Sequence, residues 1–175
     1  VRIVGAFDSR SLARSEDGLD PLDLLRSKHS TGMVGPEEHG GDTVSVVREI
    51  EHDILIEVTP TDIKGAEPAF SHMRESLLAG RDVITCNKGP LALRFKELSA
   101  LSMKTGGRLR FEGSVGGAMP VINLAREVLM GERVLKIRGI LNGTCNFILS
   151  RMGEEGLPLN QALKEAQQLG YAEAD

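Results

Sequence analysis

Aromatic side chains are scarce in this chain: they make up 3% of its residues, and tryptophan is absent. Base-stacking platforms for nucleic acids depend on such rings, as do the aromatic faces that bind carbohydrates. Positive charge is not in excess either, because 21 Lys and Arg stand against 25 Asp and Glu, a formal net charge of -4. The composition therefore argues against binding of a polyanion such as a nucleic acid.

Cysteines are also few, since Cys86 and Cys145 are the only two. They lack the paired spacing of a zinc site and are too few for a disulfide framework, so we expect both to stay reduced in a cytosol. The apolar runs, such as residues 53–58 and 118–124, are too short to cross a bilayer, and no charged-then-apolar leader opens the chain. The expected protein is cytoplasmic and does not bind membranes.

Short apolar segments alternate along the chain with segments of helical periodicity. The segments expected to be strands are residues 1–7, 53–58, 82–85, 108–112 and 134–141. Helices are expected at residues 20–28, 42–50, 67–79, 90–104, 121–130, 144–152 and 159–169, with loops at 8–20 and 30–41. Because parallel strands require crossover connections, which are usually helices, this order predicts an α/β fold with a doubly wound parallel sheet.

In such a sheet, ligands bind beyond the carboxyl ends of the strands. The first polar segment at such a place is Val58-Thr59-Pro60-Thr61, which follows an expected strand directly. It offers two hydroxyl groups and a backbone stiffened by proline, against which a cofactor could lie. A simple turn explains the same segment equally well.

A second segment, residues 85–90, places Lys88 between a strand end and a helix start. A partly desolvated lysine has a lowered pKa and can pass protons, and a charged lysine can bind a carboxylate or polarise a carbonyl. The alternative is a solvated lysine at the start of a helix. Positive charge there is mildly unfavourable because of the helix dipole, which favours a functional role.

A third segment, residues 111–120, packs three glycines behind the strand-end carboxylate of Glu112. Glycine permits close approach of the backbone to another group. Exposed carbonyls with one carboxylate suit a hard cation, and free N–H groups ahead of a helix suit an anion. A tight crossover turn is the structural alternative.

Two further segments contain polar groups at turns. Residues 139–146 form an expected strand-turn-helix junction in which Thr144 is a helix cap by residue type or a binding residue. At the end of the chain, Glu173 and Asp175 are either ligand-binding carboxylates or part of a solvated tail.

Together these segments carry a family resemblance. NKGPLA, FEGSVGGAMP, GILNGTCNFIL and LGYAEAD follow one another in this order, preceded by EVTPTDIKGAEPA. The whole chain resembles the homoserine dehydrogenases. The resemblance implies an NAD(P)-dependent oxidoreductase that interconverts L-homoserine and L-aspartate 4-semialdehyde, in the biosynthesis of threonine, methionine and isoleucine.

The resemblance also implies roles for individual residues. Lys88 takes the place of the active-site lysine that assists proton transfer at the substrate oxygen, beside the nicotinamide. Thr59, Pro60 and Asn87 match positions that line the nicotinamide end of the cofactor.

On the substrate side, Asn142, Gly143 and Thr144 match a wall of the substrate site. Glu173 matches the carboxylate that binds the substrate's amino group, and Tyr171 shapes its approach. An amino-acid substrate carries an ammonium group that favours a carboxylate partner, which agrees with this assignment.

The resemblance further implies a monovalent cation, sodium or potassium, held by Glu112 with the carbonyls of Val115 and Gly117. Cofactor choice depends on the end of the first strand, where an acidic side chain binds the ribose of NAD and an arginine favours the phosphate of NADP. Ser9 and Arg10 resemble the phosphate-side pair, whereas Asp8 is suited to a ribose. The sequence leaves NAD or NADP open.

In domain terms, residues 1–117 are expected to be a partial NAD(P)-binding domain of the Rossmann type, without its first strand and glycine-rich turn, since no G-x-G-x-x-G occurs. Residues 118–175 are expected to start an α+β substrate-binding and dimerisation domain, so that the complete protein is a homodimer. Two alternatives remain: a non-catalytic fragment, and a related two-domain dehydrogenase acting on another amino acid or semialdehyde.

Overall fold

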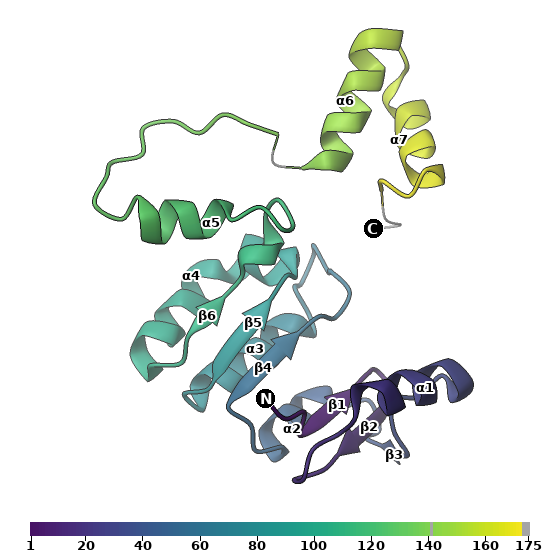
Figure 1. Cartoon of the computed structure of the whole chain (residues 1–175), viewed down its shortest axis with the longest axis vertical. Coiled ribbons are helices and arrows are strands. Elements are labelled where there is room, and N and C mark those ends of the chain that lie inside the picture. The colour runs from purple at the N-terminus through teal and green to yellow at the C-terminus, as the bar shows by residue number, and fades with distance from the viewer. Residues whose placement is uncertain (141, 173–175) are drawn as a thin grey trace. The chain divides into compact units, whose positions relative to one another are not determined.

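The computed structural model describes residues 1–140 and 142–172 of the chain (Figure 1). It forms two compact units, Val1–Phe111 and Glu112–Asp175, and each is described by itself. No helix in this described part is both long and apolar enough to span a membrane. The domain boundary expected between residues 117 and 118 and the roles expected of the two domains stay predictions.

The first unit contains the parallel sheet that the sequence predicts. Its strands are β4 (Ile54–Glu57), β5 (Asp82–Thr85) and β6 (Leu109–Arg110), paired in the order β4-β5-β6. Helix α3 (Ala69–Leu78) connects β4 to β5, and α4 (Lys88–Thr105) connects β5 to β6 (Figure 1). All pairs are parallel, so the α/β fold class is confirmed.

One face of this sheet packs on the two connecting helices. Strand residues Leu55 and Val83 are buried there with Met73 and Leu77 of α3 and Leu98 of α4. Alternate strand residues point to the opposite face, where Ile56 is 63% exposed. The core of the unit therefore lies between the sheet and α3 and α4.

A small antiparallel sheet precedes the parallel one. It consists of β1 (Gly5–Phe7), β2 (Ser11–Arg14) and β3 (Glu37–Glu38), in the order β1-β2-β3. The expectation that residues 1–7 form a strand of the parallel sheet is wrong, because β1 is shorter and pairs antiparallel with β2. The loops expected at 8–20 and 30–41 contain β2 and β3. Residues Ser11, Leu12 and Ala13 are all buried, so β2 lacks the alternation that marks a strand.

The helices that follow β2 and β3 begin at aspartate caps. The side chain of Asp20 accepts from Leu22 N ahead of α1 (Pro21–Thr31), and that of Asp42 accepts from Ser45 N ahead of α2 (Thr43–Glu49). Both caps satisfy N–H groups that have no partner within the helix.

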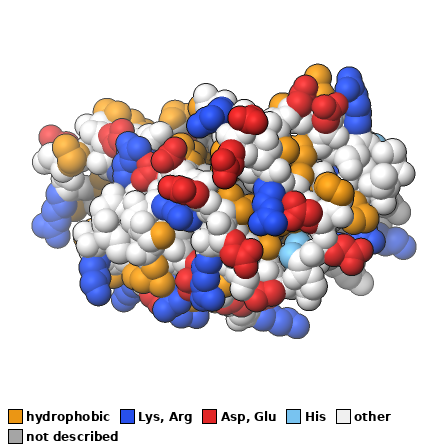
Figure 2. Space-filling model, turned by 90° about the horizontal axis from the view of Figure 1, so that it is seen from below, with side chains coloured by type: hydrophobic (Ala, Val, Ile, Leu, Met, Phe, Trp, Pro, Cys, Tyr) orange, Lys and Arg blue, Asp and Glu red, His pale blue; other side chains and the backbone are white. Residues whose placement is uncertain are grey.

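Acidic and basic side chains are interspersed on the face seen in Figure 2, without a large area of one charge.

The second unit is helical in its described part. It begins with the 3-10 turn η1 (Glu112–Ser114), followed by α5 (Val121–Asn123), which continues as the π-helical turn η2 (Leu124–Val128). Helices α6 (Gly143–Glu155) and α7 (Leu159–Gln168) form a hairpin in which Arg151 pairs with Glu165 at 2.7 Å. The strand expected at 134–141 is wrong for residues 134–140, which form none. A strand requires a hydrogen-bonded neighbour, and the described residues provide none here.

Candidate functional site

Two buried polar residues end neighbouring strands of the parallel sheet. Glu57 ends β4 and Thr85 ends β5, and the two residues are paired across the strands. Glu57 is 2% exposed and Thr85 3%. Because the strands are parallel, both side chains lie at the edge of the sheet where ligands of such folds bind.

The carboxylate of Glu57 accepts hydrogen bonds from both strand ends. Its Oε1 accepts from the backbone N–H of Thr59 at 2.8 Å and from the Thr59 hydroxyl. Its Oε2 accepts from the hydroxyl of Thr85 at 3.2 Å. Glu57 thus connects the end of β5 to the loop that follows β4.

Asn87 connects the same two segments from the other side. Its backbone N–H donates to the Thr85 hydroxyl at 2.9 Å, and its side-chain amide donates to the carbonyls of Thr59 at 3.0 Å and Pro60 at 3.5 Å. Its side-chain oxygen accepts from Gly89 N at 3.1 Å, which caps α4. We call Glu57, Thr59, Thr85 and Asn87 the strand-end network.

Lys88 follows Asn87 as the first residue of α4, and its side chain is exposed. It forms no ion pair with any residue in the described part of the chain. The next residue, Gly89, packs closely against the backbone of Asp62. A Cβ atom at position 89 would lie 2.4 Å from the carbonyl oxygen of Asp62. The structure therefore brings together Thr59, Pro60, Asn87 and Lys88, all of which the sequence analysis singles out.

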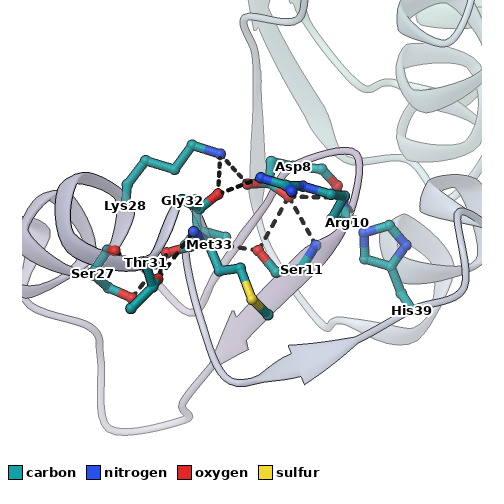
Figure 3. Close-up of polar contacts among 10 residues, drawn as sticks. Asp8, Arg10, Ser11, Ser27, Lys28, Thr31, Gly32, Met33 and His39 are labelled. Carbon is teal, nitrogen blue, oxygen red and sulfur yellow. Dashed lines mark hydrogen bonds and ion pairs between the residues drawn. The ribbon is translucent and has the colours of Figure 1, made fainter.

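The turn between β1 and β2 forms a second polar cluster, which contains Ser9 and Arg10. Asp8 lies at its centre: its Oδ1 accepts from the backbone N–H groups of Arg10 and Ser11, both at 2.8 Å, and from the Ser11 hydroxyl (Figure 3). Its Oδ2 pairs with Lys28 Nζ at 2.5 Å. Partial burial raises the pKa of Asp8, but these hydrogen bonds outweigh burial and hold that pKa well below its usual range.

The cationic side chains of this cluster meet at a single carbonyl. Arg10 Nη2 and Lys28 Nζ both donate to Gly32 O at 2.9 Å (Figure 3). His39 Nε2 lies 2.7 Å from the carbonyl of Asp8, and its Nδ1 accepts from Gly41 N. His39 therefore carries its hydrogen on Nε2 and holds the turn in place.

In the second unit, four of the predicted substrate residues lie at the start of α6 or contact it. Asn142 is the N-cap, because its side chain accepts from Cys145 N at 2.7 Å. The interpretation of Thr144 as the cap is therefore wrong: its hydroxyl donates to the carbonyl of Tyr171 instead. The Tyr171 ring lies 4.9 Å from that of Phe147, centre to centre. Gly143 is the first residue of α6, and Glu173 lies outside the described residues.

Glu112, the carboxylate of the predicted cation site, binds the backbone at the start of α5. Its two carboxylate oxygens accept from Ile122 N at 3.0 Å and Asn123 N at 2.8 Å. Val115 N lies 3.4 Å from the Glu112 carbonyl, and Gly117 has a φ of 60°, which favours glycine. An ionised carboxylate has about four lone-pair sites, and among the described residues these two amides occupy two of those of Glu112.

The roles of Glu57 and of the Thr85 hydroxyl were not predicted from the sequence. A signal was present, since Glu57 is the one charged residue within the apolar run of residues 54–58. A carboxylate in a buried strand requires hydrogen-bond partners, and the threonines at 59 and 85 were candidates by type.

The parallel β-α-β arrangement with a polar network at its strand ends defines an α/β protein of the Rossmann class. The family model for homoserine dehydrogenase matches residues 120–175. The chain is 46% identical to a homoserine dehydrogenase of Methanocaldococcus jannaschii, over 99% of this chain and 53% of that protein. It is 40% identical to an NAD(+)-dependent homoserine dehydrogenase of Pseudomonas canavaninivorans, over 100% of this chain and 51% of that protein.

Solved structures give the same result. A putative homoserine dehydrogenase of Archaeoglobus fulgidus matches 99% of this chain with a TM-score of 0.78 and 42% identity, over 51% of its own chain. A hyperthermophilic archaeal homoserine dehydrogenase in complex with NADPH matches 98% with a TM-score of 0.81 and 30% identity, over 53% of its own chain. The chain belongs to the homoserine dehydrogenase family, and it spans about half the length of these relatives.

Proposed function

We propose that the complete protein is a homoserine dehydrogenase, which interconverts L-homoserine and L-aspartate 4-semialdehyde with a nicotinamide cofactor. The observation that carries the proposal is the strand-end network, which holds Asn87 against Thr59, with the exposed Lys88 as the residue that follows Asn87. The family membership supports it, as does the relative solved in complex with NADPH. The reaction belongs to the biosynthesis of threonine, methionine and isoleucine.

A bound nicotinamide would supply or take up the hydride at the carbon that is an aldehyde in one substrate and an alcohol in the other. Thr59, Pro60 and Asn87 fit its carboxamide end, because the carbonyl oxygens of Thr59 and Pro60 have two lone pairs each, of which the Asn87 amide uses one. Lys88 assists proton transfer at the substrate oxygen, where an alcohol forms or is consumed. This role requires the exposed position that Lys88 has.

The substrate itself is assigned to residues of the second unit. Asn142, Gly143 and Thr144 would form one wall, and Tyr171 would shape the approach to Glu173. The hydroxyl of Thr144 already holds the Tyr171 carbonyl, which fixes the segment leading to Glu173. A carboxylate there suits the ammonium group of homoserine.

For the cofactor, the turn after β1 favours NADP over NAD. The carboxylate of Asp8 is occupied by Lys28 and by donors of Arg10 and Ser11, so it is not available for ribose hydroxyl groups. Ser9 and Arg10 remain exposed at the same turn and are suited to a phosphate. A higher kcat/KM with NADP than with NAD would support this choice, and the opposite order would contradict it.

A monovalent cation, sodium or potassium, is proposed at Glu112 with the carbonyls of Val115 and Gly117. A carboxylate and backbone carbonyls supply the oxygen ligands that suit such a hard cation, beside the amides of α5. Two further features stay predictions of the family resemblance: a homodimer, to be measured by sedimentation, and a location in the cytoplasm.

The test is reduction of NADP and NAD in the presence of homoserine, followed at the nicotinamide absorbance. The complete protein and the 175-residue chain are assayed side by side. Activity of the complete protein supports the proposal, whether or not the shorter chain is active. Absence of activity in the complete protein with both cofactors would favour a non-catalytic role.

A further inference from the structure

Glu57 takes no part in the proposed reaction, yet its carboxylate is buried. It is 2% exposed at the end of an otherwise apolar strand. Burial of a carboxylate costs free energy unless hydrogen bonds compensate for it. In the described part of the chain no Lys or Arg forms an ion pair with Glu57, and the hydrogen bonds to its carboxylate come from hydroxyl and amide donors.

All of these donors belong to segments of the proposed nicotinamide site. Thr59 contributes its backbone N–H and its hydroxyl, and Thr85 contributes its hydroxyl. The Thr85 hydroxyl also accepts from Asn87 N, which leaves its own hydrogen for Glu57. The carboxylate is therefore one bond from Thr59 and two bonds from Asn87.

We propose that Glu57 is a positioning residue of the nicotinamide site, which fixes Thr59 directly and Asn87 through the hydroxyl of Thr85. The inference rests on the proposed function, because Thr59 and Asn87 are assigned to the nicotinamide end of the cofactor. Glu57 sets the spacing of the two loops that would hold the nicotinamide, through its bonds to Thr59 and Thr85.

The carboxylate differs from an amide in a way that permits a test. In a Glu57→Gln variant, the amide oxygen can still accept both bonds from Thr59. Its NH2 group then faces the Thr85 hydroxyl, which already accepts from Asn87 and would lose the acceptor for its own hydrogen. The variant keeps the volume of the side chain and disturbs the branch that leads to Asn87.

The experiment compares Glu57→Gln and Thr85→Val with the parent in the complete protein, well below the unfolding temperature. We expect each variant to weaken NADPH binding and to lower kcat, by about tenfold or more, since displacement of positioning groups slows the chemical step. The primary isotope effect with cofactor deuterated at the transferred position should rise. The double variant should lose little more than either single variant, because both changes act on the same contact between residues 57 and 85.

Ser76→Ala is the matched control. Ser76 is fully buried on α3 and bonds His52, and its carbonyl accepts from Arg81 N ahead of β5, at the opposite end of the sheet. It should lower the unfolding temperature and leave the isotope effect and NADPH binding at parental values. A general loss of stability would therefore not imitate the expected result.

The outcomes separate the two proposals. Parental kcat, isotope effect and NADPH affinity in a folded Glu57→Gln variant would overturn the role of Glu57. If that variant does not fold, Thr85→Val decides by the same readouts. If the parent binds NADPH but does not oxidise homoserine, the proposed function fails, and the NADPH affinities of the variants still decide the role of Glu57.

Discussion

Lys88 is the residue on which the proposed chemistry depends most directly. A Lys88→Ala variant should lower kcat by about a hundredfold or more, because general acid–base groups contribute factors of this size. The dissociation constant of the cofactor should change much less, because the strand-end network does not include the Lys88 side chain. Steady-state kinetics and NADPH fluorescence measure the two quantities.

Lys104 provides the control for this prediction. It lies in the last turn of the same helix, α4, at the far end from Asn87. Lys104→Ala removes the same charge and should leave kcat unchanged. Parental turnover in Lys88→Ala would refute a role for this lysine in proton transfer.

The Asp8–Lys28 pair predicts a pH dependence at the residue scale. Because the pKa of Asp8 is lowered in the folded protein, its interactions stabilise the fold above the unfolded pKa of about 4. That stabilisation is lost as the pH falls from this value through the lower folded pKa. Lys28→Met removes the pairing cation and should therefore lower the free energy of unfolding at neutral pH and have a smaller effect in acid.

Urea unfolding of Lys28→Met and of the parent across this pH range provides the measurement. Arg26→Met, on the same helix α1, is the control, since Arg26 pairs with Asp23 on the exposed surface and does not reach Asp8. A difference between Lys28→Met and the parent that grows towards acid pH would contradict the assigned sign.

At the scale of elements, Asn142 at the start of α6 has a structural role and a proposed functional role, and variants of this residue can distinguish the two. Asn142→Ala removes the N-cap and should destabilise the protein by about 1 kcal/mol. Asn142→Asp keeps an acceptor for Cys145 N and should preserve the unfolding midpoint. Thermal unfolding of both variants tests the cap.

The same pair of variants also tests the substrate assignment. If Asn142 contacts homoserine through its amide, Asn142→Asp should raise the KM for homoserine without any loss of stability. A parental KM in Asn142→Asp would leave Asn142 with the capping role alone.

Elements with local signals were predicted from the sequence. Asp20 and Asp42 begin α1 and α2 as expected, and the extent of β5 agrees with its expected range. Strand β2 was not predicted because three consecutive residues of it are buried, so its sequence lacks the alternation of apolar and polar residues that marks a strand. The grouping of Thr59 with Asn87 was predictable because parallel strand ends meet at one edge. The role of Glu57 was not predicted, because its hydrogen-bond partners come together only when the two strands pair and the loop after β4 folds.

At the scale of the whole molecule, the main core of the first unit lies between the parallel sheet and its helices. Leu98 of α4 is fully buried in that core, whereas Met103 of the same helix is 78% exposed. Leu98→Ala should destabilise the protein by about 2–5 kcal/mol, because it leaves a cavity in a packed interior. Met103→Ala should leave the unfolding midpoint nearly unchanged, and equal losses in the two variants would contradict this description of the core.

The strand-end network also supplies its own reporter groups. The backbone amides of Thr59, Asn87 and Gly89 donate to the side chains of Glu57, Thr85 and Asn87. Such amides stand outside the ladders of strands and helices, so their exchange with deuterium follows the opening of side-chain contacts. Occupation of the site by a cofactor can therefore be observed as slowed exchange at these amides, with no substrate and no turnover.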